Sequence, residues 1–218
     1  MRAISLISGG IDSPVSAYLM LRRGVELVYL HFHSFPLVSR SSIYKVMQLV
    51  RILSRYGPTH TLYLAPLAET QSYLRTRVDP RYLVILYRRF MLRIAEVIAE
   101  RERAMFLVTG ESLGQVSSQT LQNLRVIDAA ARTPVLRPLI GLDKEEITAL
   151  AKEIGTYDIS IKPQEDCCTL FVPRRQATAA KLEEIEKIEK ALPVEELIAN
   201  ALEKVERMEV SMGAYLSQ

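Results

Sequence analysis

The chain has 218 residues, of which 49% are hydrophobic and 24% are charged, and its formal net charge is +3. This composition is typical of a globular protein with one sizeable core. No apolar run approaches the roughly 20 residues of a membrane-spanning helix. Met1 and Arg2 lead directly into the first predicted strand, without a signal peptide. We therefore expect a cytoplasmic protein without a membrane partner.

Charge is unevenly distributed along the chain. Residues 179–218 have a net charge of −4, so residues 1–178 carry +7. Eight arginines lie between Arg75 and Arg103, against four acidic residues. This excess indicates either solvated helix faces or a surface for polyanions such as ATP phosphates or RNA.

Predicted strands and helices alternate over the first 155 residues. A buried strand over residues 3–7 is followed by a helix over residues 14–23, with Ser13 as its N-cap and Pro14 at its first position. Further strands are predicted at 25–33, 59–65, 104–109 and 134–139, and further helices at 41–56, 82–102 and 143–154. The alternation predicts an α/β fold with a parallel twisted sheet and helices on both faces.

The loops that carry unusual residues fall at one edge of this predicted sheet. Ligands on parallel sheets bind beyond the carboxyl ends of the strands, where we place loops 8–13, 33–40 and 110–119. Past this region, residues 176–192 and 194–208 read as two acidic helices separated by Pro193. We therefore divide the chain into a nucleotide-binding domain, residues 1–175, and a C-terminal helical extension, residues 176–218.

The loop after the first strand has the sequence Ser8-Gly9-Gly10-Ile11-Asp12-Ser13. Its glycines let backbone N–H groups approach a ligand, and the following helix adds the positive end of its dipole, so the loop predicts an anion site. It lacks the Gly-x-x-x-x-Gly-Lys-Ser/Thr pattern of a Walker loop. Asp12 is a poor phosphate ligand by itself, so we expect it to act through a bound Mg²⁺. The alternative is a tight turn that binds nothing.

The two cysteines, Cys167 and Cys168, are adjacent. A disulfide between neighbours is strained and closes almost no loop. Two thiols are also too few for a structural zinc site. Either both cysteines are incidental, or at least one of them is reactive.

The loop Ser8–Ser13 resembles the PP-loop of the ATP pyrophosphatases, which split ATP between its α- and β-phosphates and adenylate a substrate. Other segments resemble the catalytic domain of the tRNA 4-thiouridine synthetases, the ThiI family. They are His31-Phe32-His33, Thr109 to Val116, Ser118 to Leu121, Arg137 to Ile140, and Glu165 to Thr169. The similarity runs from about Ala3 to about Pro173, and it implies the Rossmann-like fold of the adenine nucleotide alpha hydrolases.

The resemblance implies a set of ATP-binding residues. They are Leu6, Ile7, Ser8, Gly9, Gly10, Asp12, Ser13, His31, Phe32, Arg88, Gly110 and Gln119. In such a site Leu6, Ile7 and Phe32 would frame the adenine, and Arg88 would neutralise phosphate. Without the resemblance, His31 reads equally well as a packed ring at a strand end, and Arg88 as a surface arginine.

The implied catalytic residues are Asp12, Lys144 and Cys167. Lys144 would stabilise charge at the α-phosphate, although by itself it reads as a solvated lysine at a helix start. Cys167 matches the family's Glu-x-Cys position, where a thiolate carries or resolves sulfur. Cys168 has no assigned role.

The implied reaction is ATP-dependent sulfur transfer, in which ATP adenylates the C4 oxygen of a tRNA uridine and a persulfide sulfur then displaces AMP to leave 4-thiouridine. ATP and Mg²⁺ would be the cofactors, tRNA the substrate and a cysteine desulfurase the sulfur donor. A sulfur-carrier protein for thiamine thiazole synthesis is a second implied acceptor, and a homodimer stays open. Full members also carry a THUMP RNA-binding domain, and some a rhodanese domain. We find neither here, and therefore expect weak tRNA binding by this chain alone.

Two alternatives stay open. The first is an ammonia-using ATP pyrophosphatase that acts on a small molecule, with incidental cysteines. The second is a nucleotide-binding module without catalysis. The cysteine pair and the stretch Gly110 to Gln115 favour sulfur transfer over the first, and the intact Asp12 and Ser13 argue against the second.

Overall fold

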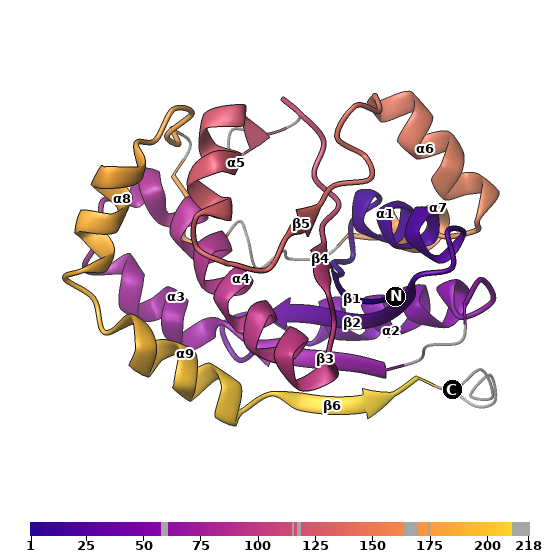
Figure 1. Ribbon diagram of the computed structural model, residues 1–218, viewed down its shortest axis with the longest axis horizontal. Coiled ribbons are helices and arrows are strands. Elements are labelled where there is room, and N and C mark those ends of the chain that lie inside the picture. Colours follow the sequence, from indigo (N-terminus) through magenta and orange to yellow (C-terminus); the bar gives the residue numbers. More distant parts are fainter. Residues whose placement is uncertain (58–60, 115, 117–118, 164–169, 174, 211–218) are drawn as a thin grey trace.

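The computed structural model describes residues 1–57, 61–114, 116, 119–163, 170–173 and 175–210. These residues form one six-stranded sheet with helices packed against it. The strand order is β5-β4-β1-β2-β3-β6 (Figure 1). The strands are β1 (Arg2–Leu6), β2 (Glu26–His33), β3 (Thr61–Pro66), β4 (Phe106–Val108), β5 (Val135–Leu136) and β6 (Glu206–Glu209). Strands β1 to β5 pair in parallel, and β6 pairs antiparallel with β3.

Both faces of the sheet are buried because its central strands are apolar at successive positions. Ile4, Val28 and Leu30 belong to one core cluster, whereas their neighbours Ala3 and Leu27 belong to the other. Such continuous apolar strands are typical of parallel sheets that helices cover on both sides.

Helices fill the two faces unequally (Figure 1). One core contains side chains of α1 (Asp12–Leu21), α2 (Ser41–Leu53), α6 (Lys144–Glu153) and α7 (Tyr157–Ser160). The other contains side chains of α3 (Ala68–Arg75), η1 (Pro80–Tyr82), α4 (Leu83–Glu102), α5 (Leu121–Asp128), α8 (Leu182–Glu189) and α9 (Val194–Glu203). The predicted fold class is confirmed. Within the described ranges, no helix is both long and apolar enough to span a membrane.

Helix α1 starts earlier than the sequence predicts. It begins at Asp12 with Ile11 at the N-cap position, so Ser13 lies inside the first turn instead of capping it. The reason is that the Ser13 hydroxyl bonds back to Ser8 and is not used as a cap. The expected cap of α6 is confirmed, because Asp143 accepts hydrogen bonds from the backbone of Glu145 and Glu146 in a capping box.

Two short helices, α3 and α5, were not predicted. Each has only 8 residues, which gives little periodicity to recognise. Thr120 caps α5 by accepting from the backbone N–H of Asn123. A threonine before an apolar run is a signal that was available in the sequence.

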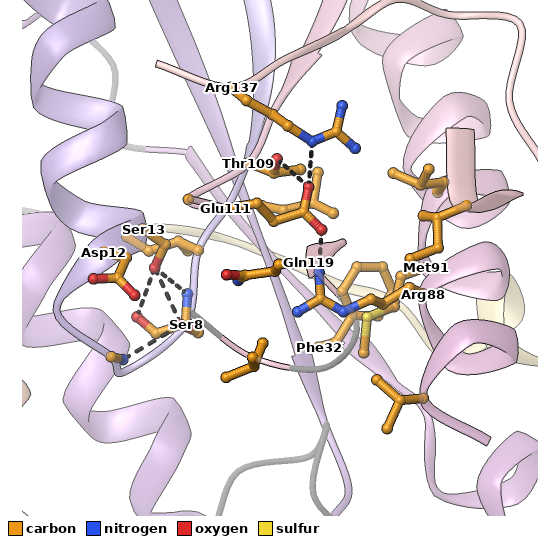
Figure 2. Close-up of a pocket in the computed structure, with 18 of the residues that line it drawn as sticks. Ser8, Asp12, Ser13, Phe32, Arg88, Met91, Thr109, Glu111, Gln119 and Arg137 are labelled. Carbon is orange, nitrogen blue, oxygen red and sulfur yellow. Dashed lines mark hydrogen bonds and ion pairs between the residues drawn. The ribbon is translucent and has the colours of Figure 1, made fainter. Parts of the chain in front are cut away.

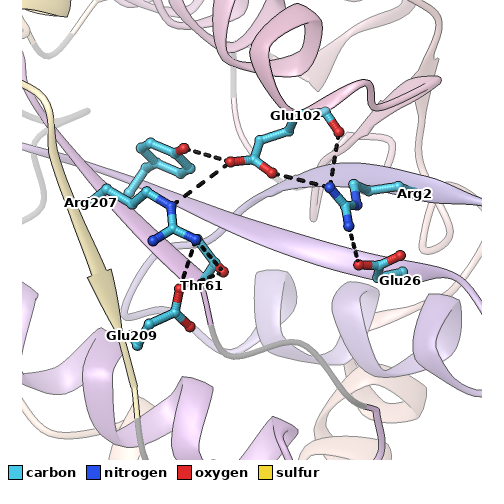
Figure 3. A network of polar contacts seen from close by, with 7 residues as sticks. Arg2, Glu26, Thr61, Glu102, Arg207 and Glu209 are labelled. Atoms are coloured by element: carbon cyan, nitrogen blue, oxygen red, sulfur yellow. Dashed lines mark hydrogen bonds and ion pairs between the residues drawn. The ribbon is translucent and has the colours of Figure 1, made fainter.

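The described part of the C-terminal segment contains strand β6 after α9, and the expected helix over 194–208 is therefore wrong beyond Glu203. Strand β6 occupies the edge of β3, whose backbone groups would otherwise lack partners on that side. Figure 3 shows how it is fixed: Arg207 reaches Glu209 at 2.8 Å and Glu102 at 4.0 Å. Arg2 links Glu102 in turn to the start of β2.

Helices α8 and α9 pack into the same core as α4. Ile185, Val194 and Leu197 are buried in that cluster. In addition, both Glu189 oxygens lie 2.7–2.8 Å from the guanidinium groups of Arg89 and Arg93. The division of the chain at residue 175 stays a prediction, but the two segments share one core.

Candidate functional site

The loop between β1 and α1 is closed by its own serines. The backbone N–H of Ser8 donates to Ser13 Oγ at 2.8 Å, and that hydroxyl donates to the Ser8 carbonyl at 3.3 Å. The N–H of Gly10 donates to Ser8 Oγ at 3.3 Å. These contacts hold a compact turn at the positive end of α1, the geometry expected of an anion cradle.

The end of β4 supports this loop through a very close backbone contact. A Cβ atom added to Gly110 would lie 2.6 Å from both the N and Cα atoms of Ser13, closer than packed atoms approach. Ser16 on α1 also donates its hydroxyl to the Thr109 carbonyl at 2.8 Å. Only glycine fits at position 110, because any side chain there would displace the start of α1.

A cavity of about 360 Å³ opens against the loop at the carboxyl edge of the sheet. Of the predicted ATP-binding residues, it is lined by Leu6, Ile7, Ser8, Gly10, Asp12, Ser13, His31, Phe32, Arg88, Gly110 and Gln119. Gly9 is buried in the loop and is not part of the lining. The structure thus brings together eleven of the twelve residues that the sequence grouped.

Of the three predicted catalytic residues, only Asp12 is seen to line the cavity among the residues that the structure describes. Asp12 lines the cavity, and the exposed Lys144 at the start of α6 donates to Asp12 Oδ1 at 2.9 Å without lining it. Cys167 and Cys168 lie outside the described residues. Within the described part of the chain, no group of three or more His, Cys, Asp or Glu side chains could hold a metal ion.

The His31 ring is structural support rather than an exposed group. It is 3% exposed, with Nδ1 3.0 Å from the Ile7 carbonyl and Nε2 3.2 Å from Ser42 Oγ. The ring therefore ties together the end of β1, strand β2 and the start of α2. This position agrees with the packed-ring interpretation of the sequence and also keeps the Ile7 backbone in place at the cavity.

Opposite the loop Ser8–Ser13, the cavity wall is built from charged groups (Figure 2). Glu111 pairs with Arg88 of α4 through one oxygen. Its other oxygen accepts from Arg137 Nε at 2.6 Å and from Thr109 Oγ1 at 2.9 Å. Arg137 continues to Asp128 at the end of α5, with two contacts of 2.9 and 2.6 Å. Four charges from four different segments thus form one chain of contacts.

Burial and charge act on Glu111 in opposite directions. Burial alone would raise the pKa of its carboxyl group, but Arg88 and Arg137 hold that pKa below its ordinary value. Glu111 is therefore ionised at neutral pH. Because it lies between two guanidinium groups, it compensates their mutual repulsion.

Sequence reasoning missed Glu111, Arg137 and Asp128 as site residues. The first two lie in segments that carry the family resemblance, Thr109 to Val116 and Arg137 to Ile140. Both also follow the carboxyl end of a parallel strand, which was an available signal. Nothing in their local sequence, however, indicates that one carboxylate serves two arginines that are 49 residues apart.

The segments on either side of residues 164–169 also contact the site. Ser160, at the end of α7, donates its hydroxyl to the Gly10 carbonyl of the loop at 3.1 Å. The buried Lys45 ammonium donates to the carbonyls of Ser160 and Lys162 at 2.8 and 2.6 Å. On the other side, Gln176 lines the cavity. Described residues on both sides of residues 164–169 therefore lie at the cavity or at its loop.

Comparisons with known proteins show the family to which this chain is similar. The family described as "Thiamine biosynthesis protein (ThiI)" matches residues 1–194. A "Probable tRNA sulfurtransferase" of Thermus thermophilus is 53% identical over 205 residues, which cover 94% of this chain and 50% of that protein. One of Moorella thermoacetica is 50% identical over 213 residues, with 98% and 55% covered. This chain spans about half the length of these curated relatives.

Two solved structures have folds that match this chain. The crystal structure of a 4-thiouridine synthetase–RNA complex with bound ATP matches with a TM-score of 0.90 and 42% identity, over 96% of this chain and 55% of that chain. The NMN synthetase from Francisella tularensis matches with a TM-score of 0.57 and 13% identity, over 93% and 84%. The second likeness shows the fold alone.

Proposed function

Because this chain belongs to the ThiI family, we propose that it forms the catalytic part of an ATP-dependent tRNA sulfurtransferase. In this proposal it adenylates the C4 oxygen of a tRNA uridine, releases pyrophosphate, and exchanges the oxygen for sulfur to give 4-thiouridine. The observation that carries the proposal is the closed loop Ser8–Ser13 at a cavity lined by eleven of the twelve expected ATP-binding residues. The ATP-bound synthetase that is 42% identical supports the same assignment.

The two sides of the cavity suit the two halves of ATP. The loop and the first turn of α1 offer backbone N–H groups and the positive end of the helix dipole to phosphates. Leu6 and Phe32 provide apolar lining for the adenine. Arg88, which also lines the cavity, would add a positive charge for phosphate.

Mg²⁺ would enter with the nucleotide. The Asp12 carboxylate lines the cavity next to the loop, and Mg²⁺ prefers a few carboxylate oxygens together with substrate phosphates over an all-protein cage. The chemistry of the residues present therefore fits this ion. Lys144, which contacts Asp12, would stabilise negative charge at the α-phosphate during adenylation.

Sulfur transfer would follow adenylation. The terminal sulfur of a persulfide on the relaying cysteine would attack C4 of the uridine, and AMP would leave with the oxygen, so that a C4–S–S–Cys disulfide forms. An external thiol reductant would then attack the cysteine sulfur and release 4-thiouridine, and a second equivalent of that reductant would restore the cysteine thiol. We assign the sulfur-relaying thiol to Cys167, with a cysteine desulfurase as donor and a sulfur-carrier protein for thiamine thiazole synthesis as a further acceptor. The hydrogen bond from Ser160 to the loop and the place of Gln176 in the cavity lining support this assignment. An RNA-binding domain of the THUMP type, as full family members carry, would position the tRNA. The reaction would take place in the cytoplasm.

The proposal is tested by separating the two steps. We expect Asp12→Ala to lower ATP–pyrophosphate exchange by the purified protein about 100-fold, because charge stabilisation at the phosphates is lost. Cys167→Ser should retain exchange but abolish 4-thiouridine, measured by mass spectrometry of tRNA nucleosides from cells that carry the variant gene. Glu195→Ala, an exposed carboxylate on α9, is the matched control. Normal exchange by Asp12→Ala would contradict the site, and normal thiolation by Cys167→Ser would contradict the relay.

A further inference from the structure

We propose that Glu111 and Arg137 are positioning residues that set the place of the Arg88 guanidinium in the cavity, and that they determine ATP affinity through Arg88. This inference rests on the proposed function, since it takes ATP to be the occupant of the cavity. It assigns a role to a charged wall that neither the phosphate loop nor the cysteines require.

Three separate segments assemble the charged wall formed by Arg88, Glu111 and Arg137. Arg88 reaches the cavity from α4, while Glu111 follows β4 and Arg137 follows β5. Glu111 is the group that contacts both arginines (Figure 2). The side chains are poorly exposed, at 19% for Arg88, 10% for Arg137 and 7% for Glu111. A planar guanidinium that pairs with a buried carboxylate is fixed in orientation as well as in place.

The charges around Arg88 balance one another. Arg88 and Arg137 contribute two positive charges in a region that water screens poorly, and Glu111 and Asp128 contribute two negative ones. Neutralising Glu111 would leave Arg88 next to Arg137 without the carboxylate that separates them. Arg88 would then be repelled from its present place, while Arg137 would keep its two contacts with Asp128.

Glu111 itself is fixed before any ligand binds. Thr109 donates to the same oxygen that Arg137 contacts, so two groups hold the carboxylate from the sheet side. Its second oxygen is the one that pairs with Arg88. The arrangement makes Arg88 a preorganised group, which lowers the cost of ordering it when the nucleotide binds.

The experiment is a double-mutant cycle on ATP affinity, measured by calorimetry with a non-hydrolysable α,β-methylene ATP and the whole protein. We expect Glu111→Gln to weaken binding about tenfold, as expected when one partner of a buried charge pair is neutralised. In the Arg88→Met background, the same substitution should have less than about a twofold effect, because its target is gone. A structural role would instead weaken binding equally in both backgrounds, and this result would overturn the inference.

Asp128→Asn, a less disruptive substitution, tests the same inference if Glu111→Gln does not fold. Asp128 is not among the residues that line the cavity, and its side chain is 40% exposed, so Asp128→Asn should fold normally. It should weaken nucleotide binding about twofold through Arg137, and only when Arg88 is present. An equal effect without Arg88 would overturn the inference. If the wild-type protein did not bind the nucleotide at all, the proposed function would fail together with it.

Discussion

The two walls of the cavity are built by different physical means. The loop wall uses a short contiguous segment, Ser8–Ser13, whose shape is set by hydroxyl and backbone hydrogen bonds and by the close contact with Gly110. The opposite wall uses three charged side chains from distant segments, Arg88, Glu111 and Arg137, and Asp128 supports Arg137 from outside the lining. Hydrogen bonds and steric contact therefore fix the loop wall, whereas the balance of opposite charges fixes the opposite wall. The two should respond differently to added volume and to changes of charge.

The largest expected effect comes from breaking the loop wall with a single methyl group. In Gly110→Ala, the new Cβ would clash with the Ser13 backbone, which is not free to move. We expect ATP affinity to fall at least about 100-fold, since displacement of binding groups by about 1 Å has such effects. The free energy of unfolding should fall by about 1–3 kcal/mol. Calorimetry and urea unfolding measure the two quantities.

The matched control is Gly141→Ala. An added Cβ at Gly141 would meet no heavy atom within 4 Å, so both ATP affinity and stability should stay close to those of the wild type. If Gly110→Ala bound ATP as well as Gly141→Ala does, the loop wall would not depend on steric contact.

A second substitution separates charges that serve the fold from charges that serve the cavity. Glu189 on α8 pairs with Arg89 and Arg93, the neighbours of Arg88 on α4, but does not line the cavity. We expect Glu189→Gln to lower the free energy of unfolding at pH 7 by about 3 kcal/mol, because two arginines lose their buried partner. ATP affinity should change less than about twofold, because the contacts of Arg88 remain.

The pH dependence of this effect has a defined sign. Burial would raise the pKa of Glu189, but hydrogen bonds and charges of Arg89 and Arg93 lower it from 4.5 to about 2. The ionised form is therefore favoured in the folded protein, and its stabilisation is fully present above pH 4.5. It is lost as the pH falls from 4.5 towards 2. Urea unfolding at several pH values should show the wild type and Glu189→Gln converging over this range, with Glu186→Gln, an exposed residue of α8, as the control.

The smallest effect on folding is expected at an exposed charge pair. The side chains of Lys144 and Asp12 are 54% and 27% exposed, so Lys144→Met should change the free energy of unfolding by less than about 1 kcal/mol. Pyrophosphate release should nevertheless slow about 100-fold if Lys144 stabilises the α-phosphate. Lys187→Met on α8 is the control. A loss of stability without a change in rate would assign Lys144 to the fold alone.

Sequence predicts the loop wall far better than the charged wall. Ser8 to Ser13 form one hexapeptide after a recognisable strand, so local pattern and fold agree. The ion pair between Glu111 and Arg88 depends on tertiary contact, and no periodic pattern in the sequence indicates it. Strand β6 was misjudged for a similar reason: Glu206 to Glu209 continue an acidic, helix-like run, and they form a strand because β3 offers an unpaired edge. The prediction for Cys167 falls outside the described residues.

The neighbouring arginines of α4 also bear on how far the protein can be shortened. Successive residues on a helix diverge by about 100°, so Arg88 faces the cavity while Arg89 faces Glu189 of α8. A truncated form that ended at residue 175 would keep nearly every cavity-lining residue. It would also leave Arg89 and Arg93 without their carboxylate and uncover the apolar surface beneath α8 and α9. The smallest stable version of this fold therefore extends at least through Ala201, well past Gln176, the last described residue that lines the cavity.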